Sequence, residues 1–207
     1  MSQFFQIHPE NPQARLINRA VEILNDGGLI IYPTDSSYAL GCVMGNKTAQ
    51  DRIRAIRRVD DRHNFTLVCR DLTEISVYAK VDNVAYRLMK GLTPGPYTFL
   101  LAATREVPRR LQNPKRKTIG LRVPDNPIAQ ALLADLGAPL MSSTLSLPGE
   151  EMPLTDPYEM RDLIGHAVDL IIDGGHCGLE PTTVVDLTGP VPELVRQGRG
   201  DVSLFED

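Results

Sequence analysis

Short apolar, β-rich runs that alternate with amphipathic helical segments are the feature of this sequence that most restricts its fold. Between residues 12 and 26, apolar side chains recur every three or four positions, and Gly27 and Gly28 end the pattern. An apolar run at residues 29–33 follows directly. Helices and strands alternate early in the chain, and strands cluster toward its end. This order predicts an α/β fold in which helices cover a mixed sheet.

The same reasoning extends along all 207 residues, with no repeat and no linker that would divide the chain. We therefore expect one domain, residues 1–207. Helices are predicted at residues 12–26, 48–58, 73–79, 83–92, 126–137 and 157–165, with Thr48 and Thr73 as candidate N-caps. Strands are predicted at residues 29–33, 65–69, 97–103, 118–123, 138–144, 168–173, 182–187 and 193–197.

Four of the predicted strands carry hydroxyl groups or a cation at one end. These side chains are Thr34, Asp35, Ser36 and Ser37 in the first, Arg122 in the second, Ser142, Ser143 and Thr144 in the third, and Thr182, Thr183 and Asp186 in the fourth. In open α/β sheets, ligands bind beyond the strand ends, and hydroxyls with one arginine suit a small carboxylate or amino acid. The alternative for each cluster is a local turn or cap, and for Arg122 a partly exposed side chain that packs along the sheet.

The positive charges of this acidic chain are concentrated in two segments. Residues 51–62 and 105–122 hold twelve Lys or Arg against four Asp or Glu, so they carry +8 while the whole chain carries −4. We expect a basic face that attracts phosphates of a nucleotide or a nucleic acid. Because residues 104–118 contain cations but no aromatic side chain, phosphate contact is favoured over base stacking. A solvated helix face is the alternative for Arg54, Arg57 and Arg58.

Several classes of site have no motif in this sequence. It contains no GxSxG, GxxxxGK[ST], CxxC or HExxH pattern, so it predicts no serine hydrolase, P-loop or metal site. His176 and Cys177 lie in a glycine-rich segment that reads as a turn, and His8, His63 and His166 are assigned surface or structural roles. Three isolated cysteines, the absence of a signal-peptide pattern and the absence of a membrane-length apolar run predict a cytoplasmic protein without membrane contact.

Six ordered motifs resemble the YrdC-like threonylcarbamoyl-AMP synthase family. The segment PTDSSYALGC resembles the family's PTDTVYGLG, and PGPYTFLL, TIGLRVP, PLMSSTLSLPG, PTTVVD and VRQG resemble its later motifs in order. The segments HNFTLVCRDL, NPIAQALL and MSQFFQIHP are most similar to the YciO branch. The resemblance implies a single-domain YrdC/RibB-like fold, with a twisted mixed sheet flanked by helices around a large concave basic cavity.

The resemblance also implies an activity, in which L-threonine, bicarbonate and ATP give threonylcarbamoyl-AMP and pyrophosphate for transfer RNA modification. ATP would be a substrate and Mg2+ would accompany it, and no covalent nucleophile is required. By position, the substrate-binding residues would be Thr34, Ser36, Tyr38, Arg122, Ser142 and Thr182. The nucleotide-binding residues would be Arg57, Arg58, Thr118, Ser143 and Arg196.

Three positions depart from the family pattern. Val59 replaces the second cation of a Lys-x-Arg element, Leu145 replaces an asparagine, and Ala39 replaces a glycine. Since these positions are expected at the nucleotide end, the chemistry there is predicted to be weak or redirected. The alternatives are a regulatory binder of small ligands, and a protein that binds double-stranded or structured RNA with little catalysis. The candidate RNA-binding residues are Arg54, Arg57, Arg109, Arg110, Lys115 and Lys117.

Overall fold

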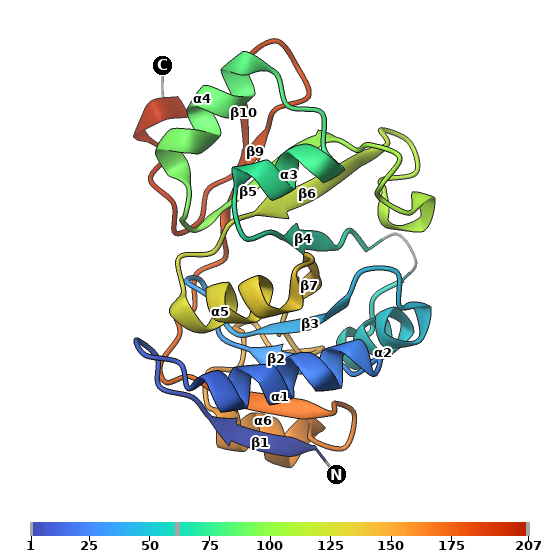
Figure 1. The fold of residues 1–207 in the computed structure, drawn as a ribbon. Coiled ribbons are helices and arrows are strands. Elements are labelled where there is room, and N and C mark those ends of the chain that lie inside the picture. Colours follow the sequence, from blue (N-terminus) through green and yellow to red (C-terminus); the bar gives the residue numbers. More distant parts are fainter. Residues whose placement is uncertain (1, 61–62, 206–207) are drawn as a thin grey trace.

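A computed structural model describes residues 2–60 and 63–205 as one twisted sheet with helices on both faces (Figure 1). The helices are α1 (Ala14–Asn25), α2 (Lys47–Arg57), α3 (Leu72–Tyr78), α4 (Asn83–Leu92), α5 (Pro127–Leu136) and α6 (Pro157–Ile164). The strands are β1 (Gln3–Gln6), β2 (Ile30–Tyr32), β3 (Ala39–Val43), β4 (Thr66–Val68), β5 (Tyr97–Ala102), β6 (Thr118–Arg122), β7 (Leu140–Thr144), β8 (Leu170–Asp173), β9 (Thr183–Asp186) and β10 (Glu193–Arg196). Short 3-10 turns lie at Arg109–Leu111 and Ser203–Phe205.

The sheet contains both parallel and antiparallel pairs. Its strand order is β1-β8-β2-β3-β7-β4-β6-β5-β9-β10. The pairs β1–β8, β2–β8, β4–β6 and β5–β9 are parallel, and the remaining neighbours are antiparallel. The mixed sheet flanked by helices that the sequence predicts is therefore confirmed.

Two strands were not predicted from the sequence. Strand β1 is a four-residue edge strand, too short for its alternation to be recognised, and it forms only by pairing with β8. Strand β3 contains Gly41, and glycine has low β-propensity. A Cβ at Gly41 would lie 2.7 Å from Cε1 of Tyr32, so the glycine lets the ring of Tyr32 pack directly on β3.

Asparagine or aspartate side chains begin the helices α2 to α6. Asn46 accepts a hydrogen bond from the backbone of Ala49 at the start of α2, and Asp71 accepts one from Glu74 at the start of α3. The predicted caps Thr48 and Thr73 lie one residue inside these helices, so those two predictions were wrong. Because an Asx side chain satisfies backbone N–H groups that the helix leaves unpaired, these caps fix where each helix begins.

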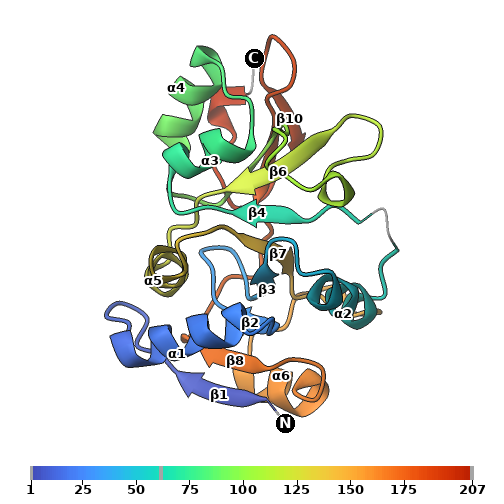
Figure 2. The same ribbon diagram turned by 45° about the vertical axis from the view of Figure 1, so that its right-hand side comes forward.

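The two faces of the sheet are covered unequally. A large apolar core contains α2, α3, α4 and α6 and spans the strands on one face. On the opposite face, α1 and α5 pack against each other and cover only strands around β8, β2, β3 and β7. In Figure 2, α1 and α5 lie below β6 and β10. Part of one sheet face is therefore left without a helix.

The length and apolar content of the helices bear on membrane insertion. Within the described residues, no helix is long and apolar enough to cross a membrane.

The N-cap of α5 provides a test of this local folding signal. Asn126 Oδ1 accepts hydrogen bonds from the backbone N–H groups of Ile128 and Ala129, both at 3.0 Å. Replacing Asn126→Ala removes this acceptor and both of its hydrogen bonds, and is expected to lower the free energy of unfolding by about 1 kcal/mol. Asn126→Asp keeps the acceptor and is the control. Urea unfolding measures both, and equal stability of the two variants would contradict the role of this cap.

Candidate functional site

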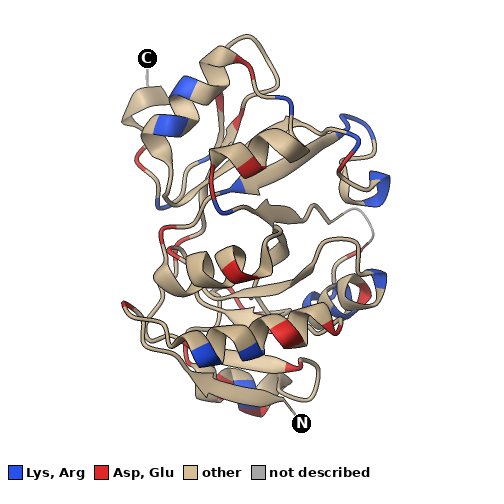
Figure 3. Cartoon of the chain, in the orientation of Figure 1, with Lys and Arg blue, Asp and Glu red and all other residues tan. Residues whose placement is uncertain are grey.

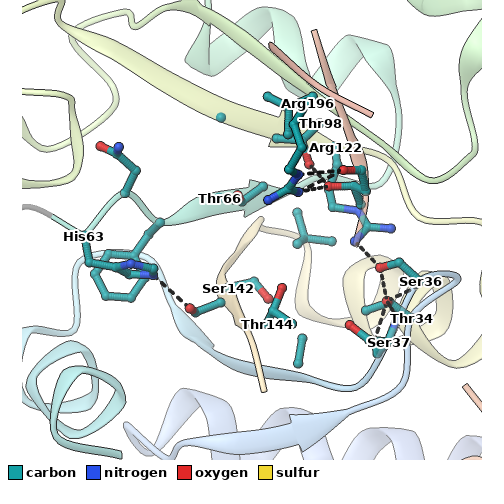
Figure 4. A pocket seen from close by; sticks show the side chains of 18 of the residues that line it. Thr34, Ser36, Ser37, His63, Thr66, Thr98, Arg122, Ser142, Thr144 and Arg196 are labelled. Atoms are coloured by element: carbon teal, nitrogen blue, oxygen red, sulfur yellow. Dashed lines mark hydrogen bonds between the residues drawn. The ribbon is translucent and has the colours of Figure 1, made fainter. Parts of the chain in front are cut away.

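The sheet face that lacks a helix is the floor of a cavity of about 610 Å³. Side chains from β4, β5, β6, β7, β9 and β10 line it, together with the turn after β2 and the end of α2 (Figure 4). The described residues that line it are Thr34, Ser36, Ser37, Ala39, Arg57, His63, Asn64, Phe65, Thr66, Val68, Thr98, Leu100, Gly120, Arg122, Ser142, Ser143, Thr144, Thr182, Val184, Val195 and Arg196. Its volume is that of a site for a small molecule.

Strand register explains the floor. Ser142 pairs with Thr66, Thr66 with Gly120, and Gly120 with Leu100, so four neighbouring strands each contribute one residue to a row across the floor. Side chains alternate along a strand, which places every second residue on the cavity side. A Cβ at Gly120 would lie 3.2 Å from Cγ2 of Thr98. The glycine therefore keeps the centre of the floor open.

The Thr34 turn forms one wall. Thr34 Oγ1 accepts hydrogen bonds from the backbone N–H of Ser36 at 3.1 Å and of Ser37 at 3.2 Å, and it donates one to the Ser37 carbonyl at 2.6 Å. This is the local turn that the sequence left as the alternative. Because the same residues line the cavity, the turn and the cavity wall are one structure.

Arg122 is the buried cation of this wall. It is 7% exposed, forms an ion pair with Asp35 through Nη2, and donates to Ser36 Oγ from Nη1 at 3.1 Å. The other oxygen of Asp35 accepts the backbone N–H of Asp125 at 2.9 Å. Arg122 Nε is buried and has no hydrogen-bond partner among the residues that the structure describes. Since a buried donor without a partner is costly, the unpaired Nε is part of the free-energy cost of placing this arginine in the wall.

A second cationic group lies on the other side of the floor. Arg57 Nη1 donates to Ser143 Oγ at 2.6 Å and is 2.9 Å from His63 Nε2, which is 3.0 Å from Ser143 Oγ. Burial, followed by the neighbouring guanidinium groups of Arg57 and Arg54, lowers the pKa of His63 to about 4. Burial also lowers the pKa of Arg57. A neutral imidazole therefore acts as an acceptor for the Arg57–Ser143 pair.

The structure explains how Ser142 and Ser143 both reach the cavity from consecutive positions. Strand β4 begins at Thr66, opposite Ser142, and residues 63–65 form no ladder with β7 beyond that pair. Ser143 is therefore accessible from the side of β7 that faces α2. His63 was assigned a surface or structural role from the sequence, because no local pattern connects it with Ser143, 80 residues away.

The third polar group of the cavity is contributed by the C-terminal strands. Thr98 Oγ1 and Thr182 Oγ1 are 2.8 Å apart, and Arg196 donates to the Thr182 carbonyl from Nη2 at 2.8 Å and from Nε at 3.2 Å. Burial lowers the pKa of Arg196. Thr182 and Arg196 thus lie together in the cavity, in the places where the sequence predicted ligand contacts.

Three of the predicted site residues do not line the cavity. Tyr38 is fully buried in the large core, and its hydroxyl donates to the Gly175 carbonyl at 2.7 Å and accepts from the Gly174 N–H at 3.1 Å. Burial raises the pKa of Tyr38 well above its usual value. Thr118 lies at the far end of β6, beyond the cavity floor. Arg58 ends α2 in a left-handed conformation, with φ of 50°, and its exposed side chain is not part of the wall.

Of the three positions that depart from the family pattern, one lines the cavity and two do not. Leu145 is fully buried in the core, where its N–H donates to the Tyr38 carbonyl, and Val59 donates its N–H to the Arg54 carbonyl after α2. Neither lines the cavity, so these two side chains offer no ligand contact in it, and weakened chemistry at the nucleotide end stays a prediction. Ala39 does line it.

The two basic segments lie side by side, as Figures 1 and 3 show on the right of the molecule. Arg110 Nη2 donates to the Gly45 carbonyl, which joins the β5–β6 loop to the turn before α2. Arg54 is not an exposed cation of this face. It pairs with Asp51 at 3.1 Å and lies over the ring of Phe65. The exposed candidates are Arg109, Arg110, Lys115 and Lys117. Asp61 and Arg62 lie outside the described residues.

The residues that line the cavity also bear on whether it can hold a metal ion. Its wall contains no Asp or Glu in the described ranges 2–60 and 63–205, and no cluster of three or more His, Cys, Asp or Glu occurs in those ranges. Mg2+ prefers carboxylate and phosphate oxygens. The side chains of this wall therefore do not fit a Mg2+ ion that is held by the protein alone.

Comparison with known proteins identifies close and distant relatives. The family model Sua5_yciO_yrdC, described as "Telomere recombination", matches residues 22–198. The Escherichia coli K12 protein "Uncharacterized protein YciO" is 62% identical over 205 residues, which are 99% of this chain and 100% of that protein. A protein from Coxiella burnetii named threonylcarbamoyl-AMP synthase is 31% identical over 159 residues, 76% of this chain and 84% of that protein.

Solved structures agree with these matches. The crystal structure of E. coli YciO superposes with a TM-score of 0.95 at 62% identity, with complete coverage of both chains. P. abyssi Sua5 complexed with L-threonine superposes with a TM-score of 0.86 at 26% identity, over 95% of this chain and 58% of that one. These comparisons confirm the family that the sequence motifs indicate.

The His63 site predicts a pH dependence of stability. A histidine whose pKa is about 4 in the folded protein and about 6.5 when unfolded takes up a proton on unfolding between those values. Stability from this group is complete above pH of about 6.5 and is lost as the pH falls toward 4. We expect a loss of about 1–3 kcal/mol, reduced from the full shift because His63 is only partly buried.

Urea unfolding at neutral and acidic pH measures this effect, with His63→Gln as the variant that keeps an acceptor but does not titrate. The wild type should lose more stability on acidification than the variant. An NMR titration that gives His63 an ordinary pKa would contradict the expected desolvation.

Proposed function

Because the chain belongs to the Sua5/YciO/YrdC family, we propose that it condenses a small amino acid, bicarbonate and ATP into an acyl adenylate. The amino acid that fits the family is L-threonine, and the products are threonylcarbamoyl-AMP and pyrophosphate. Distant relatives carry the name threonylcarbamoyl-AMP synthase, and one similar structure contains L-threonine. These names support the proposal for this chain, which is itself most similar to proteins of the YciO type.

The observation that carries this proposal is the separation of cationic groups in one cavity. Arg122 and Ser36 lie on one wall, while Arg57 and Ser143 lie on another and Arg196 on a third. A carboxylate held by Arg122 and phosphates held by Arg57 and Arg196 would leave the reacting atoms between them. Cations fixed in these positions stabilise negative charge without reorganisation.

The chemistry then requires two bonds to form in sequence. The amine nitrogen of the amino acid attacks the carbon of bicarbonate, and water leaves to give a carbamate. A carbamate oxygen next attacks the α-phosphorus of ATP, the bond to the β-phosphate oxygen breaks, and pyrophosphate leaves. Holding the reactants in one geometry supplies much of the reduction in barrier, so no protein nucleophile is needed.

Substitution of Arg122 tests the carboxylate position. Arg122→Gln removes a charge-assisted hydrogen bond of about 1.5–3 kcal/mol, so kcat/KM for threonine should fall about ten- to a hundredfold. Pyrophosphate release from ATP that depends on threonine and bicarbonate is the measurement. Arg122→Lys keeps the charge that neutralises Asp35 and should lose less, and thermal unfolding verifies that both variants fold. Arg87→Gln, on the exposed surface of α4, is the control.

Assays of the wild-type protein distinguish three outcomes for the proposed condensation reaction. Pyrophosphate release by the wild type supports it. Stabilisation by threonine or ATP without turnover would support a regulatory binder instead. If the wild type releases no pyrophosphate and neither ligand changes its thermal stability, the proposal is wrong.

RNA binding is the second candidate function, and the hydrogen bond from Arg110 to Gly45 is the observation that favours it. That contact brings the basic β5–β6 loop against the start of α2, so cations far apart in sequence form one face. Lys and Arg on a common face neutralise successive backbone phosphates. Transfer RNA or another double-stranded RNA is the partner that this charge pattern suits.

Four substitutions test this face. Changing Arg109, Arg110, Lys115 and Lys117 to Ala should lower the affinity for duplex RNA and flatten its dependence on salt, because each lost phosphate contact releases about one counterion fewer. Fluorescence anisotropy at several salt concentrations measures both effects. The matched control changes four other exposed cations to Ala, on α1, after α3 and on α4: Arg15, Lys80, Arg87 and Lys90. A binding curve that the four substitutions leave unchanged would reject this surface.

A further inference from the structure

A second hollow, of about 510 Å³, lies in the loop between β5 and β6 and shares no lining residue with the main cavity. We call it the loop hollow. Its lining residues are Ala103, Thr104, Arg105, Val107, Pro108, Arg109, Gln112, Asn113, Pro114 and Lys117. Three are cations and none is Asp or Glu. The proposed reaction in the main cavity makes no use of this site.

The loop around the hollow is held to the body of the protein at two places. Arg110 donates to the Gly45 carbonyl on one side. Arg116 donates to Asp186 Oδ2 at 2.6 Å and to Thr188 Oγ1 at 3.0 Å on the other. Asn113 Oδ1 also accepts the backbone N–H of Arg116 at 2.9 Å, within the loop. The hollow is therefore preorganised, because two arginines anchor the segment that surrounds it.

The remaining cations of the loop have no such partners. In the described part of the chain, the side chains of Arg109 and Lys117 make no hydrogen bond or ion pair, whereas arginines elsewhere pair with carboxylates, as Arg52 does with Asp169 at 2.6 Å. Arg105 contacts only Glu106, at 3.4 Å, with a side chain that is 96% exposed. Like charges repel unless an anion lies between them. Cations gathered around one hollow without a carboxylate among the lining residues thus favour an anionic ligand.

The backbone at Lys117, which borders the hollow, has an uncommon conformation. Its φ is 53°, in the left-handed region that non-glycine residues seldom adopt. The conformation directly precedes β6, and its N–H donates to the Asn113 carbonyl at 2.8 Å. The fold therefore maintains a disfavoured backbone geometry where a cation borders the hollow, as is common at ligand sites.

We propose that the loop hollow is a second phosphate site, which binds a phosphate ester of a nucleotide or of an RNA strand. Arg109 and Lys117 provide the charge, and the amide side chains of Gln112 and Asn113 border the same space. Guanidinium and ammonium groups bind phosphate oxygens through charge-assisted hydrogen bonds. The hollow has no aromatic lining residue, so it recognises the phosphate rather than a stacked base.

The double variant Arg109→Ser/Lys117→Ser tests this site, with Arg87→Ser/Lys90→Ser on α4 as the matched control of equal charge. Calorimetry with AMP and anisotropy with a short RNA duplex measure the affinities. An Arg57→Ala/Arg196→Ala background, in which the wild-type hollow is the reference, removes both phosphate positions expected in the main cavity, so that AMP binding there does not mask the hollow. We expect the double variant to lose at least about tenfold in affinity, and the control to lose much less.

The two probes distinguish the source of the phosphate. Loss of affinity for both AMP and RNA indicates a site for free nucleotides as well as RNA, and loss for RNA alone indicates a backbone contact. For RNA, the salt slope should fall by about two, one for each cation removed. Equal affinities of the double variant and the wild type for both probes would overturn the proposal. In the double variant with Arg57 intact, pyrophosphate release in the main cavity should be unchanged, because Arg109 and Lys117 do not line that cavity. Failure of the first proposed function therefore does not decide this result.

Discussion

Unequal cover of the sheet is the constraint on which the rest of this structure depends. Four helices form one continuous core on one face, whereas α1 and α5 cover only part of the other. Since sheets twist from strand to strand, the distant strands β5, β6 and β9 contribute no residue to the core that α1 and α5 form. An apolar floor left open in this way would be unfavourable in water. Here the exposed positions are largely hydroxyls, a glycine and arginines, so the sequence of the floor is compatible with a solvent-filled cavity.

Buried arginines determine the charge of each cavity wall. Arg122 is neutralised by Asp35, which keeps a charge in the interior at an acceptable cost, but the pair leaves Nε as an unused donor. Among the described residues, Arg57 has no carboxylate in that role and instead contacts Ser143 and the neutral imidazole of His63. One wall is thus close to neutral overall, whereas the other retains its positive charge. This difference suits a zwitterionic amino acid on the first wall and phosphate on the second.

The places of Val59 and Leu145, which depart from the family pattern, bear on the comparison with threonylcarbamoyl-AMP synthases. Leu145 packs in the core and Val59 follows α2 outside the wall, so these substitutions remove contacts without reshaping the cavity. His63 places a neutral acceptor beside Arg57. The chain shares the fold of P. abyssi Sua5. In the proposed reaction, the phosphates of ATP would contact Arg57 and Arg196, the two arginines other than Arg122 among the described residues that line the cavity.

The amino-acid sequence by itself determined which segments form helices and most strands, because periodicity and Asx or glycine signals act over a few residues. It also identified Arg122, Ser142 and Thr182 as polar positions on apolar strands. Only the tertiary structure decided which of these side chains meet. Tyr38 and Ser36 are two residues apart, yet one enters the core and the other the cavity, because the Thr34 turn redirects the chain between β2 and β3. His63 reaches Ser143 through the pairing of β4 with β7, segments far apart in sequence. Such contacts depend on strand order and register, and local sequence preferences do not specify either.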